Sequence, residues 1–345
     1  MHPHRRFYIS LVAAAVAAVA FFALNIFFGS VHIAPATVVD ALTGRGGIDE
    51  AAEYIVLSSR VPQAVAAALC GAGLAAAGLM LQTLFDNPLA DPSILGINSG
   101  ASLGVAIVIL STGGGAAIAG IGLSGFALTV AAAFAGAAVV LALLTAMAAV
   151  VRNGLVLLIA GIMVGYVISA VVELLSSIAT AEGVRSYVFW GMGSFGGVSR
   201  EMLPAFALLM LGAMAFSLTL ARPLDAMLLG DNYAANLGVS VRRMRILVFL
   251  ATGVLSAVPT AMCGPVAFIG LAVPHIARFA SGAATHGRLM PLAMLCGAAV
   301  AEICNLVCNL PADGTIIPLN VVTSLWGVPV IFYVLMSARR SGTMG

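Results

Sequence analysis

The sequence predicts an all-α membrane protein, a bundle of about ten transmembrane helices, and two observations carry that prediction. Of the 345 residues, 62% are hydrophobic and only 8% are charged, whereas about a quarter of the residues in a soluble globular domain are charged. The apolar residues also gather into stretches of about 20, long enough to cross a hydrocarbon layer roughly 30 Å thick. These stretches lack the alternation of a membrane β-barrel, so helices are the expected way across.

Ten apolar stretches follow one another along the chain. The first lies behind a short basic segment and is too long for a signal peptide, so we interpret it as a membrane helix. Residues 115–151 can form one long tilted helix or two short ones, and the seventh and eighth stretches together form an apolar run broken only at Gly264-Pro265. The predicted spans are residues 7–28, 61–82, 93–111, 115–151, 155–179, 202–221, 246–262, 265–284, 289–310 and 317–337.

The basic residues decide between these alternatives and orient the chain. All 15 are arginines, and basic residues concentrate on the cytoplasmic side of membrane helices. With ten crossings and a cytoplasmic N-terminus, all but Arg45, Arg60, Arg185 and Arg200 fall at the cytoplasmic side. Splitting 115–151, or merging the seventh and eighth stretches, reverses the sidedness of everything that follows. We therefore predict that both termini are cytoplasmic.

Glycines spaced four apart predict close packing between some of these helices. Each pair lies on one helical face, where the missing side chains allow neighbouring backbones to approach. The pairs are Gly100 and Gly104, Gly161 and Gly165, and Gly193 and Gly197.

Two acidic residues, Glu173 and Glu302, lie inside predicted spans. An ionisable group at membrane depth costs about 3 kcal/mol unless it is paired, protonated or wetted. Each is therefore either a carboxylate that lines a polar pathway or a group hydrogen-bonded between helices. For Glu302 we favour the second interpretation, and for Glu173 both stay open. Met163 and Ser169, on the same span as Glu173, are further candidates for a pathway wall.

The sequence offers no catalytic, metal or nucleotide site. Cys304 and Cys308 lie four apart, but no third ligand accompanies them to complete a zinc site. There is no metalloprotease or serine-hydrolase motif, and no glycine-rich phosphate loop of the Gly-x-x-x-x-Gly-Lys-Ser/Thr type. No basic tract suggests nucleic acid. We expect neither an enzyme nor a cofactor bound by this chain.

The longest cytoplasmic connection, residues 222–245, is the candidate surface for a partner. Asp225 and Asp231 are placed to begin short helices, and Gly238 is placed to end one. Such a loop either enters a groove of another protein or is an ordinary solvated connection with its arginines on the inner side.

Several stretches resemble the FecCD-type permeases, the membrane subunits of type II ABC importers for ferric siderophores, haem and cobalamin. The most specific is FDNPLADPSILGINSGASLG at residues 85–104, and the likeness covers nearly the whole chain. The other matching stretches are Arg60-Val61-Pro62, WGMGSFGGV at 190–198, LGDNYAANLGV at 229–239, GPVAFIGLAVPHIAR at 264–278 and PLNVVTSLWGVPVIFYVL at 318–335.

The resemblance implies the type II ABC importer permease fold, with residues 1–345 forming one transmembrane domain in the bacterial inner membrane. It also implies a homodimer, two cytoplasmic ATPase subunits that bind ATP and Mg²⁺, and a periplasmic or lipid-anchored substrate-binding protein. The expected cargo is an iron chelate or cobalamin. The alternative is an ion-coupled secondary transporter of a small organic solute, although such carriers usually hold more ionisable groups at the membrane midplane than two scattered carboxylates.

The resemblance also assigns residues by position. The cytoplasmic gate falls on Asn87, Leu89, Gly154 and Leu155, and contact with the ATPase on Gly230, Asp231, Asn232, Asn236, Leu237 and Gly238. Docking of the binding protein falls on Arg60 and Gln63, the latter standing where the family has an arginine. Another docking arginine is replaced by Leu306, so we expect weaker electrostatic steering, with Arg45, Arg185 or Arg200 able to compensate.

Overall fold

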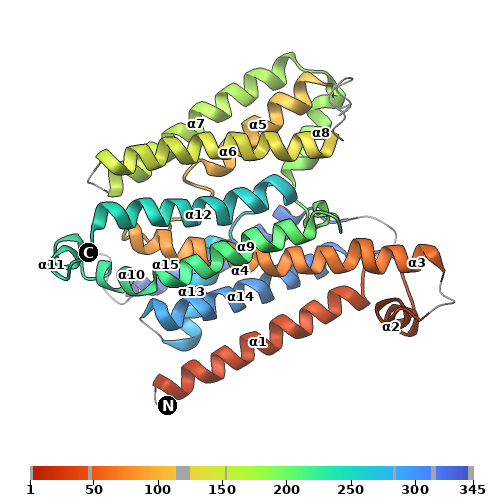
Figure 1. Ribbon diagram of the computed structural model, residues 1–345, viewed down its shortest axis with the longest axis horizontal. Coiled ribbons are helices and arrows are strands. Elements are labelled where there is room, and N and C mark those ends of the chain that lie inside the picture. The colour runs from red at the N-terminus through yellow and green to blue at the C-terminus, as the bar shows by residue number, and fades with distance from the viewer. Residues whose placement is uncertain are drawn as a thin grey trace. The chain divides into compact units, whose positions relative to one another are not determined.

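The computed structural model describes residues 3–45, 49–113, 125–151, 154–282, 285–311 and 316–340, and within these ranges it contains helices and no strand (Figure 1). The all-α prediction is therefore confirmed. The chain divides into two compact units. Unit 1 comprises Met1–Leu79, Phe195–Leu211 and Ala267–Gly345, and unit 2 comprises Met80–Ser194 and Gly212–Val266.

The helices of unit 1 come from both ends of the chain. They are α1 (Pro3–Phe27), α2 (Pro35–Thr43), α3 (Glu50–Tyr54), most of α4 (Val61–Leu84), the first part of α9 (Leu203–Thr219), α13 (Ile269–Ser281), α14 (His286–Cys308) and α15 (Leu319–Arg340). A π-helical segment, Ile55–Arg60, joins α3 to α4.

The helices of unit 2 come from the middle of the chain. They are α5 (Ile97–Ser111), α6 (Gly125–Val150), α7 (Gly154–Ile178), α8 (Ala181–Gly191), α10 (Ala221–Met227), α11 (Asp231–Asn236) and α12 (Val241–Cys263), together with the ends of α4 and α9.

Each of the ten predicted spans coincides with a helix of the structure. Among the described residues, six helical stretches are long and apolar enough to cross a membrane, and the bent pair α9 and α10 makes up to seven. α5 and residues 319–334 of α15 are shorter apolar helices. The chain is thus a multi-pass membrane protein, while the total of ten crossings stays a prediction.

The structure describes part of the first uncertain region and all of the second. Residues 125–150 form one helix, α6, and residues 114–124 lie outside the described part of the chain. Between α12 and α13 the chain breaks over residues 264–268, where Gly264 has φ 76° and Phe268 has φ 66°. Such angles are incompatible with a continuing right-handed helix, so the seventh and eighth predicted spans are not merged.

Three local predictions are wrong. α5 begins at Ile97 rather than at residue 93, because residues after Pro92 form turns first. α10 begins at Ala221, so Asp225 lies inside that helix instead of starting one. Gly193 and Gly197 do not share a helical face, since α8 ends at Gly191 and a 3-10 turn occupies residues 195–197.

The other glycine pairs make close helix contacts, as expected. A Cβ on Gly104 would overlap the carbonyl oxygen of Ala132, so α5 lies directly against α6. On the opposite side, a Cβ on Gly161 would lie 3.2 Å from the carbonyl oxygen of Leu95, where α7 meets the segment before α5. Figure 1 shows α5 running between these two neighbours. In unit 1, Gly71 of α4 meets Gly297 of α14 in the same way.

Two arginines fasten α1 to the rest of unit 1. At its N-terminal end, Arg6 donates from Nε to the carbonyl of Ala280 at 2.9 Å, close to the end of α13. At its C-terminal end, the guanidinium of Arg60 donates to the carbonyls of Ile26 and Phe27 at 3.0 and 2.9 Å. The last carbonyls of a helix lack helical partners and carry partial negative charge, so a cation is favourable at both places.

Candidate translocation and coupling sites

The predicted gate residues lie where the end of α4 meets the start of α7. The loop after α4 turns sharply, with Asp86 at φ 46°, and the Asn87 side chain accepts a hydrogen bond from the Leu89 backbone at 2.9 Å. A Cβ on Gly154 would lie 3.6 Å from the carbonyl oxygen of Leu84 at the end of α4. The structure thus brings the two chain segments of the predicted gate together.

The leucines of the gate are its exposed members. Leu89 is partly exposed, and Leu155 on the first turn of α7 is largely exposed. A second copy of the chain, or closure of the pathway, can therefore cover them.

The predicted coupling segment is two short helices, α10 and α11, joined by a turn. α11 begins at Asp231, and Gly238 follows its end with φ 83°, so the predictions for these two residues are confirmed. All six predicted coupling residues are exposed. Large apolar side chains are exposed beside them, including Tyr233 at 50% and Leu237 at 60%. An exposed apolar surface with a polar rim is typical of a contact with another protein.

Arg245 of α12, which sequence reasoning did not single out, anchors this segment. Its guanidinium is buried and donates to the Asp231 carboxylate at 2.7 Å. A second nitrogen donates to the carbonyl of Val151 at 3.1 Å, directly after α6 and three residues before Gly154. One side chain thus connects the coupling helix to the segment that enters the gate.

The pathway candidates Glu173 and Ser169 lie on one wall of a small polar pocket in unit 2. The pocket has a volume of about 260 Å³ and is lined from α5, α7 and α8. Met163 does not line it and is exposed elsewhere on α7. Sequence reasoning missed the rest of the polar wall, which comes from other helices. The lining residues are Ser99, Ser102, Ile168, Ser169, Val172, Glu173 and Tyr187.

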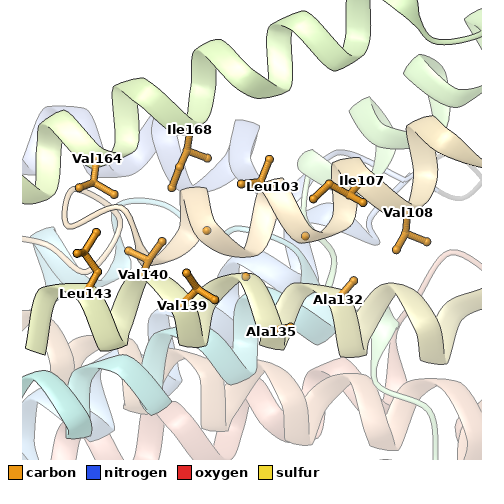
Figure 2. Close-up of a pocket in the computed structure, with 13 residues that line it drawn as sticks. Leu103, Ile107, Val108, Ala132, Ala135, Val139, Val140, Leu143, Val164 and Ile168 are labelled. Atoms are coloured by element: carbon orange, nitrogen blue, oxygen red, sulfur yellow. The ribbon is translucent and has the colours of Figure 1, made fainter. Parts of the chain in front are cut away.

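A larger cavity of about 500 Å³ lies between α5, α6 and α7 (Figure 2). Figure 2 shows Val164 and Ile168 of α7 pointing toward the side chains of α5 and α6 across it. Its lining contains only glycine, alanine, valine, leucine and isoleucine. Such a wall offers no hydrogen bond to a polar cargo, whereas binding sites combine apolar walls with a few placed polar groups. Of the two, the smaller pocket has the chemistry of a binding site.

The two predicted docking residues both have internal partners. Arg60 is only 6% exposed and is bonded to α1, as described above. Gln63 donates to the Asn305 side chain at 3.0 Å, and Leu306 is half-buried. Their contact with a binding protein stays a prediction.

The three other outer arginines also have neighbours. Arg45 lies 3.9 Å from Asp40, and Arg185 lies 5.6 Å from the ring centre of Phe189. Arg200 shares a shallow pocket with two glutamates of α3. Acidic side chains therefore accompany two of the three arginines that could compensate for Gln63 and Leu306.

Glu302 is the buried, hydrogen-bonded carboxyl that we expected. It is 0% exposed and accepts a hydrogen bond of 2.6 Å from the Asn25 side chain of α1. Asn305 donates to the same Asn25 at 2.8 Å and in turn accepts from Gln63. The other Glu302 oxygen, Oε1, has no partner among the described residues. This chain of side chains joins α1, α4 and α14 and holds them in register.

Within the described ranges, no three His, Cys, Asp or Glu side chains gather in a metal-binding group. Cys304, one of the two cysteines spaced four apart, accepts a hydrogen bond from the Trp326 indole at 3.0 Å.

These features define a class of protein: a multi-pass membrane protein of the permease kind, in which Arg245 ties an exposed pair of short helices to the chain just before α7. The model of the FecCD transport family matches residues 17–337, and the chain belongs to that family. It is therefore a transport subunit of an ABC importer and not an enzyme, and such a permease works with ATPase subunits and a substrate-binding protein.

Named relatives cover almost the same length. The chain is 33% identical over 321 residues to the vitamin B12 import system permease protein BtuC of Citrobacter koseri, covering 92% of this chain and 91% of that protein. It is 34% identical over 291 residues to the BtuC protein of Klebsiella pneumoniae subsp. pneumoniae, covering 84% and 85%.

A solved structure agrees with the fold. It is described as an inward-facing conformation of a metal-chelate type ABC transporter and superposes with a TM-score of 0.80 at 28% identity. The match covers 95% of this chain and 98% of that one. The permease fold expected from the motifs is therefore confirmed.

Proposed function

We propose that this permease imports a metal chelate, cobalamin or an iron chelate such as a ferric siderophore or haem, from the periplasm into the cytoplasm. The observation that carries the proposal is the likeness, along nearly the whole chain, to relatives named for vitamin B12 import and to a transporter of the metal-chelate type. No other class of cargo is named among these relatives.

The working unit of the proposal is a dimer of this chain. α7 carries Ser169 and Glu173 on exposed positions, and a carboxylate facing lipid is costly. A second copy that encloses an aqueous pathway against this face provides the polar surroundings that the two side chains need.

Energy would come from two cytoplasmic ATPase subunits that bind ATP and Mg²⁺. The surface for them is α10 and α11, including Gly230, Asp231, Asn232, Asn236, Leu237 and Gly238. Movement there would reach the gate at Asn87, Leu89, Gly154 and Leu155 through Arg245, because that side chain contacts both the coupling helix and the segment before α7.

Reconstitution tests the proposal against the alternative. Vesicles that contain the permease, its ATPase and its binding protein should accumulate radiolabelled cyanocobalamin or a ferric chelate only when ATP is enclosed with the ATPase. Vesicles with the permease alone should be inert, with or without a proton gradient. Gradient-driven uptake by the permease alone would instead support an ion-coupled secondary transporter of a small organic solute.

A further inference from the structure

The polar pocket of unit 2 brings together side chains from three helices that are far apart in sequence. α5 contributes two serines, α7 contributes Ser169 and Glu173, and α8 contributes Tyr187. The Tyr187 and Ser102 hydroxyls are hydrogen-bonded to each other, which links α8 to α5. A single glutamate and four hydroxyl groups therefore surround about 260 Å³.

A glycine on α7 leaves room for the α5 wall of this pocket. Gly165 has no side chain, and a Cβ at that position would lie 3.4 Å from the Ser99 hydroxyl. The serine therefore occupies the space between α5 and α7 that a larger residue at 165 would fill. On the other side of Ile168, the same two helices line the wholly apolar cavity of Figure 2. Of these two pockets, only the one lined by Glu173 contains polar side chains.

Glu173 gives the lining of the pocket a negative charge that no positive charge balances. No basic residue lines it, and Glu173 takes part in neither ion pair found among the described residues. Arg185 of α8 lies over the Phe189 ring and outside the lining. The Glu173 carboxylate is exposed on the single chain, so water or a cargo molecule in the pathway can reach it. An ionised carboxylate only accepts hydrogen bonds, while the hydroxyls can both donate and accept.

We propose that this pocket is a cargo subsite that accepts hydrogen-bond donors, such as carboxamide N–H or ammonium groups, from neutral or cationic chelates and that repels anionic chelates. The inference rests on the proposed function and narrows it. Glu173 provides the charge, and the serines and Tyr187 provide hydroxyls that adapt to different donors. Among metal chelates, cobalamins and ferric trihydroxamates meet this description, whereas ferric triscatecholates carry a large negative charge.

The charge preference can be measured without cargo or partners. Ser169→Cys, in membrane vesicles, is reacted with cationic and anionic methanethiosulfonates of similar size, and the rate ratio is normalised to a free thiol in solution. The unmodified chain, whose cysteines are buried or half-buried, gives the background. A nearby unit charge should favour the cationic reagent by roughly three- to tenfold, and adding Glu173→Gln should bring the ratio close to one.

Two further variants serve this test, one as a control and one as a second reporter. Glu182→Gln removes an exposed glutamate of α8 that does not line the pocket, and it should leave the ratio unchanged. Ser102→Cys, on the α5 wall, is a second reporter in case the first does not fold. Failure of both folded reporters to react, or a ratio that Glu173→Gln does not change, would overturn the subsite.

Uptake then separates the subsite from the proposed function. In vesicles with ATPase and binding protein, Glu173→Lys should lower the uptake rate of cyanocobalamin or a ferric trihydroxamate at least threefold, while Glu182→Gln should not. Normal uptake by Glu173→Lys would contradict the subsite but leave import intact. No uptake by the parent chain, with the alkylation ratio as expected, would contradict import but leave the charge preference of the pocket.

Discussion

At the scale of single residues, Arg245 is the side chain that joins the predicted coupling helix to the segment before the predicted gate. It is buried, and it contacts Asp231 of α11 and the backbone of Val151. We expect Arg245→Gln to lower cargo uptake per ATP hydrolysed several-fold, because the coupling helix loses its connection to the segment before the gate. The measurement is ATPase activity and uptake in the same vesicles. Arg242→Gln, at an exposed position of the same helix, is the control.

The ion pair between Arg245 and Asp231 should contribute little to the free energy of unfolding. Asp231 is half exposed, and solvent screens such a pair, so a double-mutant cycle with Asp231→Asn should give a coupling energy of about 1 kcal/mol or less. Equal uptake per ATP in the parent and Arg245→Gln would remove Arg245 from the mechanism.

Asp91, in the loop between α4 and α5, gives a pH-dependent prediction. It is buried, and its Oδ1 accepts hydrogen bonds from the Ser93 backbone, at 2.8 Å, and hydroxyl. Burial raises its pKa, an effect that these hydrogen bonds partly offset. The folded chain then binds this proton more tightly than the unfolded chain, so stability falls as pH rises from the ordinary pKa toward the raised one.

Asp91→Asn keeps the acceptor oxygen and removes the charge. We expect a higher thermal midpoint than the parent at neutral pH, and a smaller loss of midpoint between mildly acidic and neutral pH. Thermal unfolding in detergent at several pH values measures this. Asp86→Asn, at an exposed position, should change neither quantity. A lower thermal midpoint of Asp91→Asn at neutral pH would contradict this prediction, because it would mean that the ionised Asp91 carboxylate stabilises the folded chain.

Asn25 and Glu302 give a third prediction. Asn25→Ala removes the partner of the buried carboxyl and should destabilise the chain by about 1–3 kcal/mol. Replacing both, Asn25→Leu with Glu302→Leu, should recover part of that loss because the unpaired carboxyl is gone, whereas Asn305 still loses its acceptor on Asn25. Thermal unfolding in detergent compares the variants. A double variant as unstable as Asn25→Ala would show that the carboxyl itself is required.

The sequence predicted the kind of environment for Glu302 but not its partner. A glutamate inside an apolar stretch needs a hydrogen bond, but Asn25 lies 277 residues away, and no local pattern indicates that contact. The same holds for Ser99 and Ser102 of the polar pocket and for the contact of Arg245 with Val151, 94 residues away. Each is an ordinary residue in the sequence and gains these contacts only when distant segments meet.

At the scale of helices, the glycine contacts decide the packing of α5. A side chain at Gly104 would overlap the backbone of α6. We expect Gly104→Leu to separate the two helices and to reduce the yield of folded protein sharply, measured by gel filtration in detergent. Gly212→Ala is the matched control, since its Cβ would meet nothing within 4 Å, and alanine favours a helix by about 1 kcal/mol over glycine. Normal folding of Gly104→Leu would mean that this contact is not required.

Hydropathy predicted where the helices are better than where they begin. All ten apolar stretches contain a helix, because burial from water acts over a whole span. The helix α5 begins four residues later than the predicted span because turns come first, and α10 begins before the aspartate that was expected to start it. Single capping residues contribute only about 1 kcal/mol, so packing overrides them.

At the scale of the whole chain, the sidedness of the loops is the prediction that most needs a measurement. With ten crossings, Glu201→Cys should react with a membrane-impermeant thiol reagent from the periplasmic side. Tyr233→Cys, on the exposed face of α11, should react only in inverted vesicles. The reverse pattern, or both positions on one side, would contradict the ten-crossing topology, and the parent chain supplies the background.

Motifs along nearly the whole chain indicated the family, and the match over residues 17–337 confirms it. The cargo was not predicted to the same detail. The polar pocket that we propose as a cargo subsite combines Glu173 with side chains from other helices, and no local motif indicates such a combination.

The two arginines that fasten α1 become available at very different times during synthesis. Arg60 follows Ile26 by only 34 residues. Its hydrogen bonds to the end of α1 can therefore form soon after the second apolar stretch leaves the ribosome. Arg6 must wait for Ala280, 274 residues later. Until residue 280 has been synthesised, the N-terminal end of α1 therefore lacks this contact, while its C-terminal end can already bind Arg60.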